Sequence, residues 1–383
     1  MKVKVKGESP IAIDLFSGCG GFSTGLLDAG YRVVSGIDFD KPSIKCYEYN
    51  HSYRGSQGFV GDISILSGKT ILSMSGVTSC DILVGGPPCQ AFSIAGKRRA
   101  LDDSRGQLIF DFIRLVHEIQ PQVFIMENVP NLARFDQGSL FNEIIQSLEA
   151  LGYHVNHQVL HAADYGIPQM RKRMFVVGCQ KQLLTFPTPT HSSEQLSLFQ
   201  QLPIHLNAED AIGDLPDVSL EKENMIPNHE PTIHSPQMIE TFAQLKPGTR
   251  DRKSFHDKLS PGKLSYTLRA GSGNFSPLRP VHYKYPRVIT VRESARIQSF
   301  SDDFIWIDSI PRMQQYRQVG NAVPPLMSRV LGAWVASQMG WELYPSQFKG
   351  DPSERQPYAE RSWEERLQVQ KKLIRGASAG GGR

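Results

Sequence analysis

The sequence predicts an α/β protein built on a doubly wound, mainly parallel β-sheet, with a smaller domain inserted in it. Strand patterns alternate with helix patterns over about the first 180 residues, the order typical of such sheets. Glycine, acidic and cysteine residues follow the apolar runs, where strands of such a sheet end and ligands bind. After Val177 the alternation stops and Pro, Ser, Asn and His become frequent, which indicates the second domain.

Composition sets the class of protein. The chain has 383 residues, 40% hydrophobic and 21% charged, with a net charge of +4, which is typical of a soluble protein of about two domains. No apolar run is long enough to span a membrane, and the basic N-terminus lacks the apolar segment of a secretory signal. The five cysteines show no metal-ligand spacing, so we expect a cytoplasmic protein without a metal site or disulfides.

The first 38 residues predict a strand–helix–strand unit. An apolar strand over 11–16 leads into the glycine turn 17–21, and a helix over 22–29 ends at Gly30. A second strand over 31–37 is followed by Asp38, an acid suited to the hydroxyls of a ribose. The turn suits close backbone contact with a nucleoside cofactor, although many such turns only begin a helix. Its spacing lacks the Gly-x-Gly-x-x-Gly pattern, which argues against a nicotinamide cofactor.

The same alternation continues along the chain. We expect strands over 59–60, 81–84, 122–126 and 153–160 and another opened by residues 169–173, with helices over 43–50, 107–119, 140–151, 326–338 and, in the polar tail, 361–375.

The stretch from Gly85 to Ser93 carries the most chemical information. Two glycines allow close backbone approach, and two prolines stiffen the loop that presents Cys89. A thiol there can act as a nucleophile if its pKa is lowered, whereas a lone cysteine is more often a small buried hydrophobe. Glu127 ends another apolar run and Arg171 and Arg173 open a third, so several reactive groups share the strand ends.

The segment from 189 to 286 is expected to form the inserted domain. Its first part has nine acids and one lysine over 187–245, and residues 246–269 then hold seven Lys or Arg against two Asp. Aromatic and small polar residues among these cations suit a nucleic-acid backbone and base edges, although a solvated charged face has the same composition. We therefore divide the chain into 1–188, 189–286, a return to the first domain over 287–345 and a polar tail over 346–383.

Six short motifs, in order, resemble those of the cytosine-C5 DNA methyltransferases, in particular the bacterial restriction-modification type. The resemblance covers about residues 11–340. The motifs are Asp14–Gly21, Pro87–Gln90, Glu127–Val129, Gln169-x-Arg171-x-Arg173, Arg292–Arg296 and Gly320–Val323. The resemblance implies that the inserted domain recognises the DNA target. It also implies a methyltransferase that uses S-adenosylmethionine.

The resemblance assigns the catalytic groups. Cys89 would add to C6 of a flipped-out cytosine and so activate C5 toward methylation. Glu127, holding a proton, would hydrogen-bond the N3 edge, Arg173 would contact O2, and Arg171 would help to hold the pocket. A buried ion pair is the plainer reading of Glu127 and Arg173, and both readings can hold together.

The resemblance also assigns binding residues. The residues expected around S-adenosylmethionine are Phe16, Gly18, Gly20, Gly21, Asp38, Phe39, Asp62, Ile63, Gly86, Pro88, Leu108, Asn321 and Ala322. Phe39 stands where the family often has tryptophan, and it can still stack on adenine. The residues expected to bind DNA are Ser93, Lys97, Arg98, Arg99 and Arg105 in a loop hinged at Gly96, and Arg250, Arg252 and Lys253 in the inserted domain.

Double-stranded DNA is the expected partner of a monomeric enzyme, with a restriction endonuclease acting on the same site as a further possibility. Two alternatives stay open. A tRNA cytosine-C5 methyltransferase would share the fold, but the Cys-Phe-Thr tripeptide of that branch is absent and a full-sized recognition segment is present. A catalytically silent DNA-binding regulator would not need Cys89, Glu127 and Arg173 together.

Overall fold

The structure, a computed structural model, describes residues 8–88, 104–193, 202–218, 226–270 and 280–349. Its contacts divide the chain into two compact units. The sheet unit comprises residues 1–160, 172–187 and 328–383, and the insert unit comprises residues 161–171 and 188–327. The insert unit thus includes residues 287–327, which the sequence analysis assigned to the first domain.

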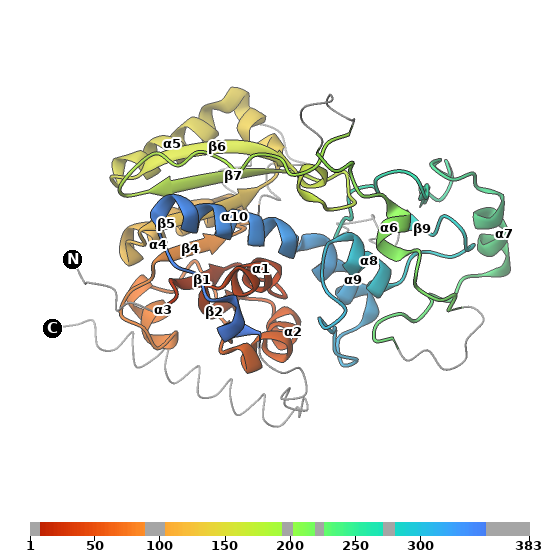
Figure 1. The fold of residues 1–383 in the computed structure, drawn as a ribbon, viewed down its shortest axis with the longest axis horizontal. Helices are drawn as coiled ribbons and strands as arrows, with labels where there is room; N and C mark the ends of the chain where they lie inside the picture. The colour runs from red at the N-terminus through yellow and green to blue at the C-terminus, as the bar shows by residue number, and fades with distance from the viewer. Residues whose placement is uncertain (1–7, 89–103, 194–201, 219–225, 271–279, 350–383) are drawn as a thin grey trace. The chain divides into compact units, whose positions relative to one another are not determined.

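The described strands of the sheet unit form one seven-stranded sheet in the order β3-β2-β1-β4-β5-β7-β6 (Figure 1). The strands are β1 (Ile11–Leu15), β2 (Arg32–Asp38), β3 (Gln57–Val60), β4 (Ile82–Gly85), β5 (Val123–Asn128), β6 (His154–His161) and β7 (Lys172–Cys179). Neighbours from β3 to β5 pair in parallel, and β7 runs antiparallel to β5. The prediction of a mainly parallel α/β sheet is confirmed.

Helices pack on both faces of this sheet. They are α1 (Gly21–Ala29), α2 (Lys41–His51), α3 (Gly68–Met74), α4 (Ser104–Ile119), α5 (Ser139–Ala150) and α10 (Pro325–Met339), with the 3-10 turns Ser52–Arg54, Pro130–Gly138 and Pro345–Phe348. Side chains of α3, α4 and α5 join those of the strands in one large apolar core. On the other face, hydrogen bonds from Ser328 to the Phe22 carbonyl and from Tyr31 to the Gly332 carbonyl fasten α10 to α1 and its neighbouring strand.

The central strands follow directly from their sequences. Strand β4 is a run of apolar residues that is buried throughout, as expected for a parallel strand covered on both faces. Helix α1 ends where Gly30 adopts a left-handed conformation, φ 104°, as predicted from its position.

Three features differ from the sequence prediction. Glu127 lies inside β5 rather than after it, because pairing with β7 extends the strand to Asn128. The short helix α3 was not predicted, since its seven residues show too few helical turns for a clear period. The predicted tail helix over 361–375 lies outside the described residues.

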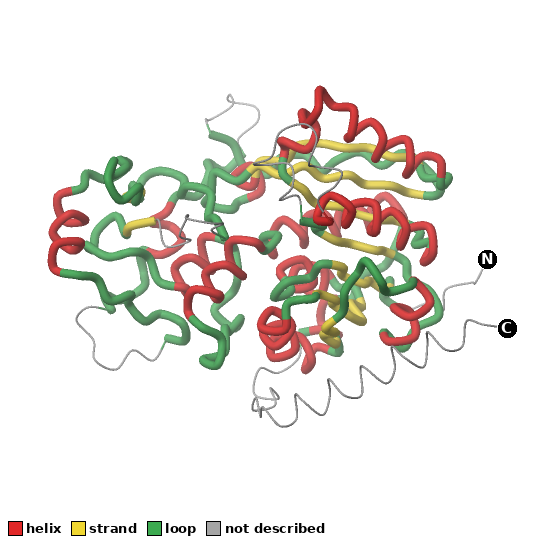
Figure 2. The backbone as a smooth tube through the Cα atoms, turned by 180° about the vertical axis from the view of Figure 1, so that it is seen from behind, coloured by secondary structure: helices red, strands yellow, loops and turns green. Residues whose placement is uncertain are grey.

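The insert unit contains little regular structure, and loops make up most of its described residues (Figure 2). Its elements are the 3-10 turn Ala162–Tyr165, the helices α6 (Ala208–Ile212), α7 (Pro236–Gln244), α8 (Val291–Ile297) and α9 (Arg312–Asn321), and the two-stranded β8 (Asp257–Lys258) and β9 (Pro280–Val281). Helices α8 and α9 pack within this unit, which explains why residues 287–327 belong to it.

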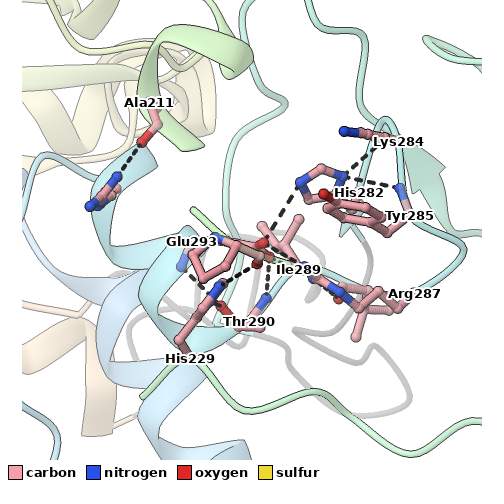
Figure 3. Close-up of polar contacts among 12 residues, drawn as sticks. Ala211, His229, His282, Lys284, Tyr285, Arg287, Ile289, Thr290 and Glu293 are labelled. Carbon is pink, nitrogen blue, oxygen red and sulfur yellow. Dashed lines mark hydrogen bonds and ion pairs between the residues drawn. The ribbon is translucent and has the colours of Figure 1, made fainter. Parts of the chain in front are cut away.

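A buried polar network organises the insert unit around Glu293 (Figure 3). The two guanidinium Nη atoms of Arg287 donate to its two carboxylate oxygens, both at 2.8 Å. Glu293 also accepts from the backbone of Thr290, whose own hydroxyl accepts from the Glu293 backbone and so caps α8. Burial alone would raise the pKa of Glu293, but the hydrogen bonds and charge of Arg287 hold this pKa below its usual value.

In the described part of the chain, no helix combines the length and the apolar character needed to cross a membrane.

Candidate active site

The turn after β1 is shaped by backbone conformations that favour glycine. Gly18 and Gly20 have φ of 55° and 95°, and even Phe16 is held at φ 56°. A side chain at Gly20 would place its Cβ 2.3 Å from His51, whereas a Cβ at Gly18 would meet nothing within 4 Å. The turn is thus packed tightly on its inner side and open beside Gly18, as a cradle for a ligand requires.

Asp38, at the end of β2, holds this turn in place. Its carboxylate accepts from the backbone N–H of Gly18 at 2.9 Å and from that of Asp40, also at 2.9 Å. Burial raises the pKa of Asp38, and these two hydrogen bonds act against the rise. The neighbouring Phe39 is 70% exposed, which is unusual for a large aromatic side chain and leaves its ring available for stacking.

Three further residues expected around the cofactor follow β3 and β4. Asp62, after β3, is exposed and accepts from the backbone and hydroxyl of Ser64, while Ile63 is buried in the apolar core. Leu108, on α4, is half-buried. Asp62 and Ile63 thus follow β3, whereas Leu108 lies on the helix after β4, and β2 and β1 separate these two strands in the sheet.

Glu127 and Arg173 form an ion pair across β5 and β7. Their Oε1 and Nε atoms are 2.8 Å apart, with 12% and 19% of the side chains exposed. The antiparallel register places Glu127 opposite Phe175 and Asn128 opposite Met174, which brings Arg173 beside the end of β5. A carboxyl held this way can bind a polar ring edge while the guanidinium keeps further donors for an adjacent oxygen.

The loop that leads to Cys89 lies beside this pair. A Cβ at Gly86 would lie 3.4 Å from Glu127 Oε2, and the buried Asn128 amide donates to the Pro87 carbonyl at 3.1 Å. The motif Glu127–Val129 gave no role to Asn128. Its contact with Pro87 joins residues 41 positions apart in the sequence, so only the structure shows it. Cys89 follows Pro88 directly in the sequence but lies outside the described residues.

Residues of two separated motifs, and Gln298 just after a third, meet within the insert unit. The guanidinium of Arg171, which is 2% exposed, donates to the carbonyls of Gly320 and Ala322, both at 3.0 Å. Gln298 donates to the same Ala322 carbonyl and accepts from Gln169. Arg171 therefore positions the backbone at residues 320–322.

The chain matches the family model described as C-5 cytosine-specific DNA methylase over residues 11–335. It is 37% identical over 330 residues to the Type II methyltransferase M1.HphI of Haemophilus parahaemolyticus, with 83% of this chain and 84% of that protein covered. It is 32% identical to the Type II methyltransferase M.XorII of Xanthomonas oryzae, with 85% and 84% covered. The chain belongs to the C-5 cytosine-specific DNA methylase family. It is therefore a DNA (cytosine-5-)-methyltransferase.

Solved structures agree with this assignment. A DNA modification methyltransferase encoded within an E. coli prophage aligns with a TM-score of 0.71 and 28% identity, covering 87% of this chain and all of that one. The Dnmt2 methyltransferase of S. pombe aligns with a TM-score of 0.62 and 17% identity over 87% of this chain, which shows the shared fold.

The residues of this methyltransferase that were expected to bind DNA or cofactor are only partly covered by the described structure. Ser93, Lys97, Arg98 and Arg99 lie outside the described residues, as does the side chain of Arg105. Asn321 is exposed and Ala322 half-buried, both in the insert unit.

The cations of segment 246–269 in the insert unit differ in their exposure to solvent. Arg250, Arg252 and Lys253 are exposed, as DNA contacts require. Lys258, counted among the seven cations of this segment, is 6% exposed, and its Nζ donates to the Phe242 carbonyl at 2.9 Å. The charge pattern could not separate this structural lysine from its exposed neighbours.

Proposed function

We propose that this methyltransferase moves a methyl group from S-adenosylmethionine to C5 of a flipped-out cytosine in a specific duplex DNA sequence, through a covalent bond between Cys89 and C6. The observation that carries the proposal is the Glu127–Arg173 ion pair, 2.8 Å across, beside the Gly86–Pro88 loop that immediately precedes Cys89. A nucleophile and a carboxyl group that can share a proton with the N3 edge are the two groups that cytosine activation needs.

The chemistry assigns a step to each residue. The Cys89 thiolate adds to C6, and the ring electrons move to C5 while Glu127 supplies a proton to N3. Arg173 contacts the exocyclic O2 of the base and keeps Glu127 in place through the ion pair. After C5 has been methylated, it loses its proton to a base, and the electron pair left behind expels the Cys89 thiolate. N3 returns its proton to the Glu127 carboxylate, which restores the aromatic ring and the starting state of the acid.

The residues of the sheet unit fit the cofactor. S-adenosylmethionine supplies the electrophilic methyl group when it is bound. The open side of Gly18, the carboxylate of Asp38 and the exposed ring of Phe39 provide backbone contact, a hydroxyl acceptor and a stacking surface for a nucleoside. Asp62 can accept from the adenine amino group.

We assign catalysis to the sheet unit and DNA recognition to the insert unit. The relatives are named Type II methyltransferases, which supports a role in protecting a defined site within a restriction-modification system. Because a side-chain nucleophile cannot reach C6 of a cytosine stacked within a duplex, the base must leave the stack. The segment 93–105 carries four cations suited to hold the DNA backbone during this step. Residues 93–103 of it lie outside the described residues, and Arg105 lies in α4 rather than in a loop.

The test compares Cys89→Ser with the wild type and with Cys179→Ala, which removes a buried thiol on β7 instead. Cys89→Ser is expected to abolish tritium transfer to DNA and covalent trapping by 5-fluorocytosine, while cofactor affinity stays within a few-fold of wild type. Cys179→Ala should keep both activities. Efficient turnover by the serine variant would remove Cys89 from the nucleophilic role.

A further inference from the structure

Among the exposed cations of the insert unit that the structure describes, Arg250 is distinguished by a carboxylate that fixes its orientation. Its Nε donates to Asp257 Oδ1 at 2.6 Å and its Nη2 to Asp257 Oδ2 at 3.0 Å. Asp257 has only 8% of its side chain exposed, whereas Arg250 has 50% exposed. One edge of the guanidinium is thus held by a buried acid, and the rest of the group faces accessible space.

Short strands, a buried hydrogen bond and a small apolar core support this pair. Asp257 begins β8, which pairs with the buried strand β9, and residues 250 and 257 form an antiparallel bridge. Lys258 ties β8 to the Phe242 carbonyl, and Phe242 packs with Val281 in a small apolar core. A bidentate ion pair on such a base loses little further side-chain entropy when a ligand binds.

The remaining donors of Arg250 are suited to a particular acceptor. A guanidinium has five N–H groups, and the two bonds to Asp257 leave both hydrogens of Nη1 and one of Nη2. In the part of the chain that the structure describes, these donors have no other hydrogen-bond partner. Together Nη1 and Nη2 form a planar fork, which matches O6 and N7 of guanine in the major groove.

The charge of the pair favours a base edge over a phosphate. Asp257 neutralises Arg250, so an approaching phosphate would meet a carboxylate as well as a guanidinium. A guanine edge carries two neutral acceptors and meets no such repulsion. The exposed Arg252 has no acid partner among the described residues and is better suited to a phosphate contact.

The surroundings provide space for a base pair's edge. A pocket of about 180 Å³ lies beside the pair, lined by Met170, Arg250, Asp257, Tyr266, Thr267, Arg269 and Pro280. At the tip of the loop that joins Arg250 to Asp257, Phe255 is 53% exposed with φ 60°, a conformation that costs energy for an aromatic residue. Strained backbone conformations of this kind cluster at active sites and ligand clamps.

We infer that Arg250, oriented by Asp257, reads one guanine of the target sequence through its major-groove edge. Asp257 acts as a positioning residue and Arg250 as a determinant of sequence specificity. The inference rests on the proposed DNA methylation, and it adds that the enzyme recognises one base pair of its target through Arg250.

The experiment methylates a random-sequence duplex library and reads every 5-methylcytosine with its flanking bases. Arg250→Ala is expected to lose the preference for guanine at one position, by roughly 5- to 150-fold, with the rest of the site unchanged. Asp257→Asn should relax the same position by a smaller factor. Arg252→Ala, the matched control on the same loop, should keep the full site while its binding weakens and its salt slope falls by about one.

A second measurement does not depend on whether the Asp257 variant folds. Replacing that guanine by 7-deazaguanine removes N7, and it should lower the kcat/KM of the wild type but leave that of Arg250→Ala unchanged. An Arg250→Ala enzyme that keeps the wild-type site, or that responds to 7-deazaguanine as the wild type does, overturns the inference alone. A wild type that methylates no cytosine overturns the proposed function, and the inference with it.

Discussion

The two units are stabilised by different kinds of buried residues. The sheet unit packs an apolar core between parallel strands and helices, and one carboxylate inside it, Asp14, accepts hydrogen bonds from Ser23. The insert unit has few regular elements, and its largest fully buried side chains include Arg171 and Arg292. Where repetitive secondary structure is scarce, buried cations satisfy the carbonyls that a helix or sheet would otherwise pair.

This difference should make the folding stability of the two units respond differently to substitutions at buried positions. Loss of a methylene in an apolar core leaves a small cavity, whereas loss of one member of a buried ion pair leaves an uncompensated charge. The insert unit should therefore be the more sensitive of the two to single substitutions at buried positions. Three predictions test this comparison.

The largest effect is expected for Glu293→Gln in the insert unit. The change leaves the buried Arg287 guanidinium without its counter-charge, which costs about 3–5 kcal/mol of unfolding free energy. Hydrogen exchange of peptides from the insert unit, with and without urea, measures the loss. Glu240→Gln, on the exposed face of α7, is the matched control and should change stability by less than about 0.5 kcal/mol. Equal effects of the two variants would contradict the comparison.

The second prediction concerns pH, to which the two units should respond with opposite sign. In the insert unit, burial lowers the pKa of His282 from 6.5 to about 4, with smaller and opposing effects of Glu293 and Arg287. Its Nδ1 accepts from the backbone N–H groups of Lys284 and Tyr285, an arrangement possible only for the unprotonated atom. The unfolded chain binds a proton first, so lowering the pH from 7 to about 4 should cost this unit on the order of 3 kcal/mol.

In the sheet unit, burial raises the pKa of Asp14 from 3.8 to about 7, while its hydrogen bonds with Ser23 oppose the rise. Here the folded state binds the proton first, so the same fall in pH should favour folding through this group. Hydrogen exchange across this pH range, corrected for intrinsic rates, compares the units. His282→Asn keeps an acceptor but cannot titrate, and it should flatten the response of the insert unit. If the fall in pH stabilised both units, or destabilised both, the roles given to His282 and Asp14 would be contradicted.

The smallest effect is expected for Ile13→Val in the sheet unit. Ile13 is fully buried on β1, and removing one methylene should cost about 1 kcal/mol. Ile65→Val removes the same group from a side chain that is 80% exposed and should change nothing measurable. Urea denaturation of both variants checks the difference. A loss for Ile13→Val as large as that for Glu293→Gln would remove the distinction between the units.

The sequence by itself determined the parallel sheet, the turn at Gly18 and Gly20 and the place of Glu127 near a strand end. These features are encoded locally, because apolar runs specify buried strands and glycines permit the backbone conformations of the turn. The family resemblance, carried by six short motifs, was confirmed by the match over residues 11–335.

Only the tertiary structure decided which charged residues are structural. Arg171 and Lys258 lie in cationic stretches, yet both are buried against carbonyls of residues distant in sequence. Arg250 acquires its orientation from Asp257, and Glu127 its partner from an antiparallel strand that begins 45 residues later, at Lys172. The physical reason is that a local pattern reports the periodicity of burial along one element, whereas the partner of a charge depends on how separate elements pack.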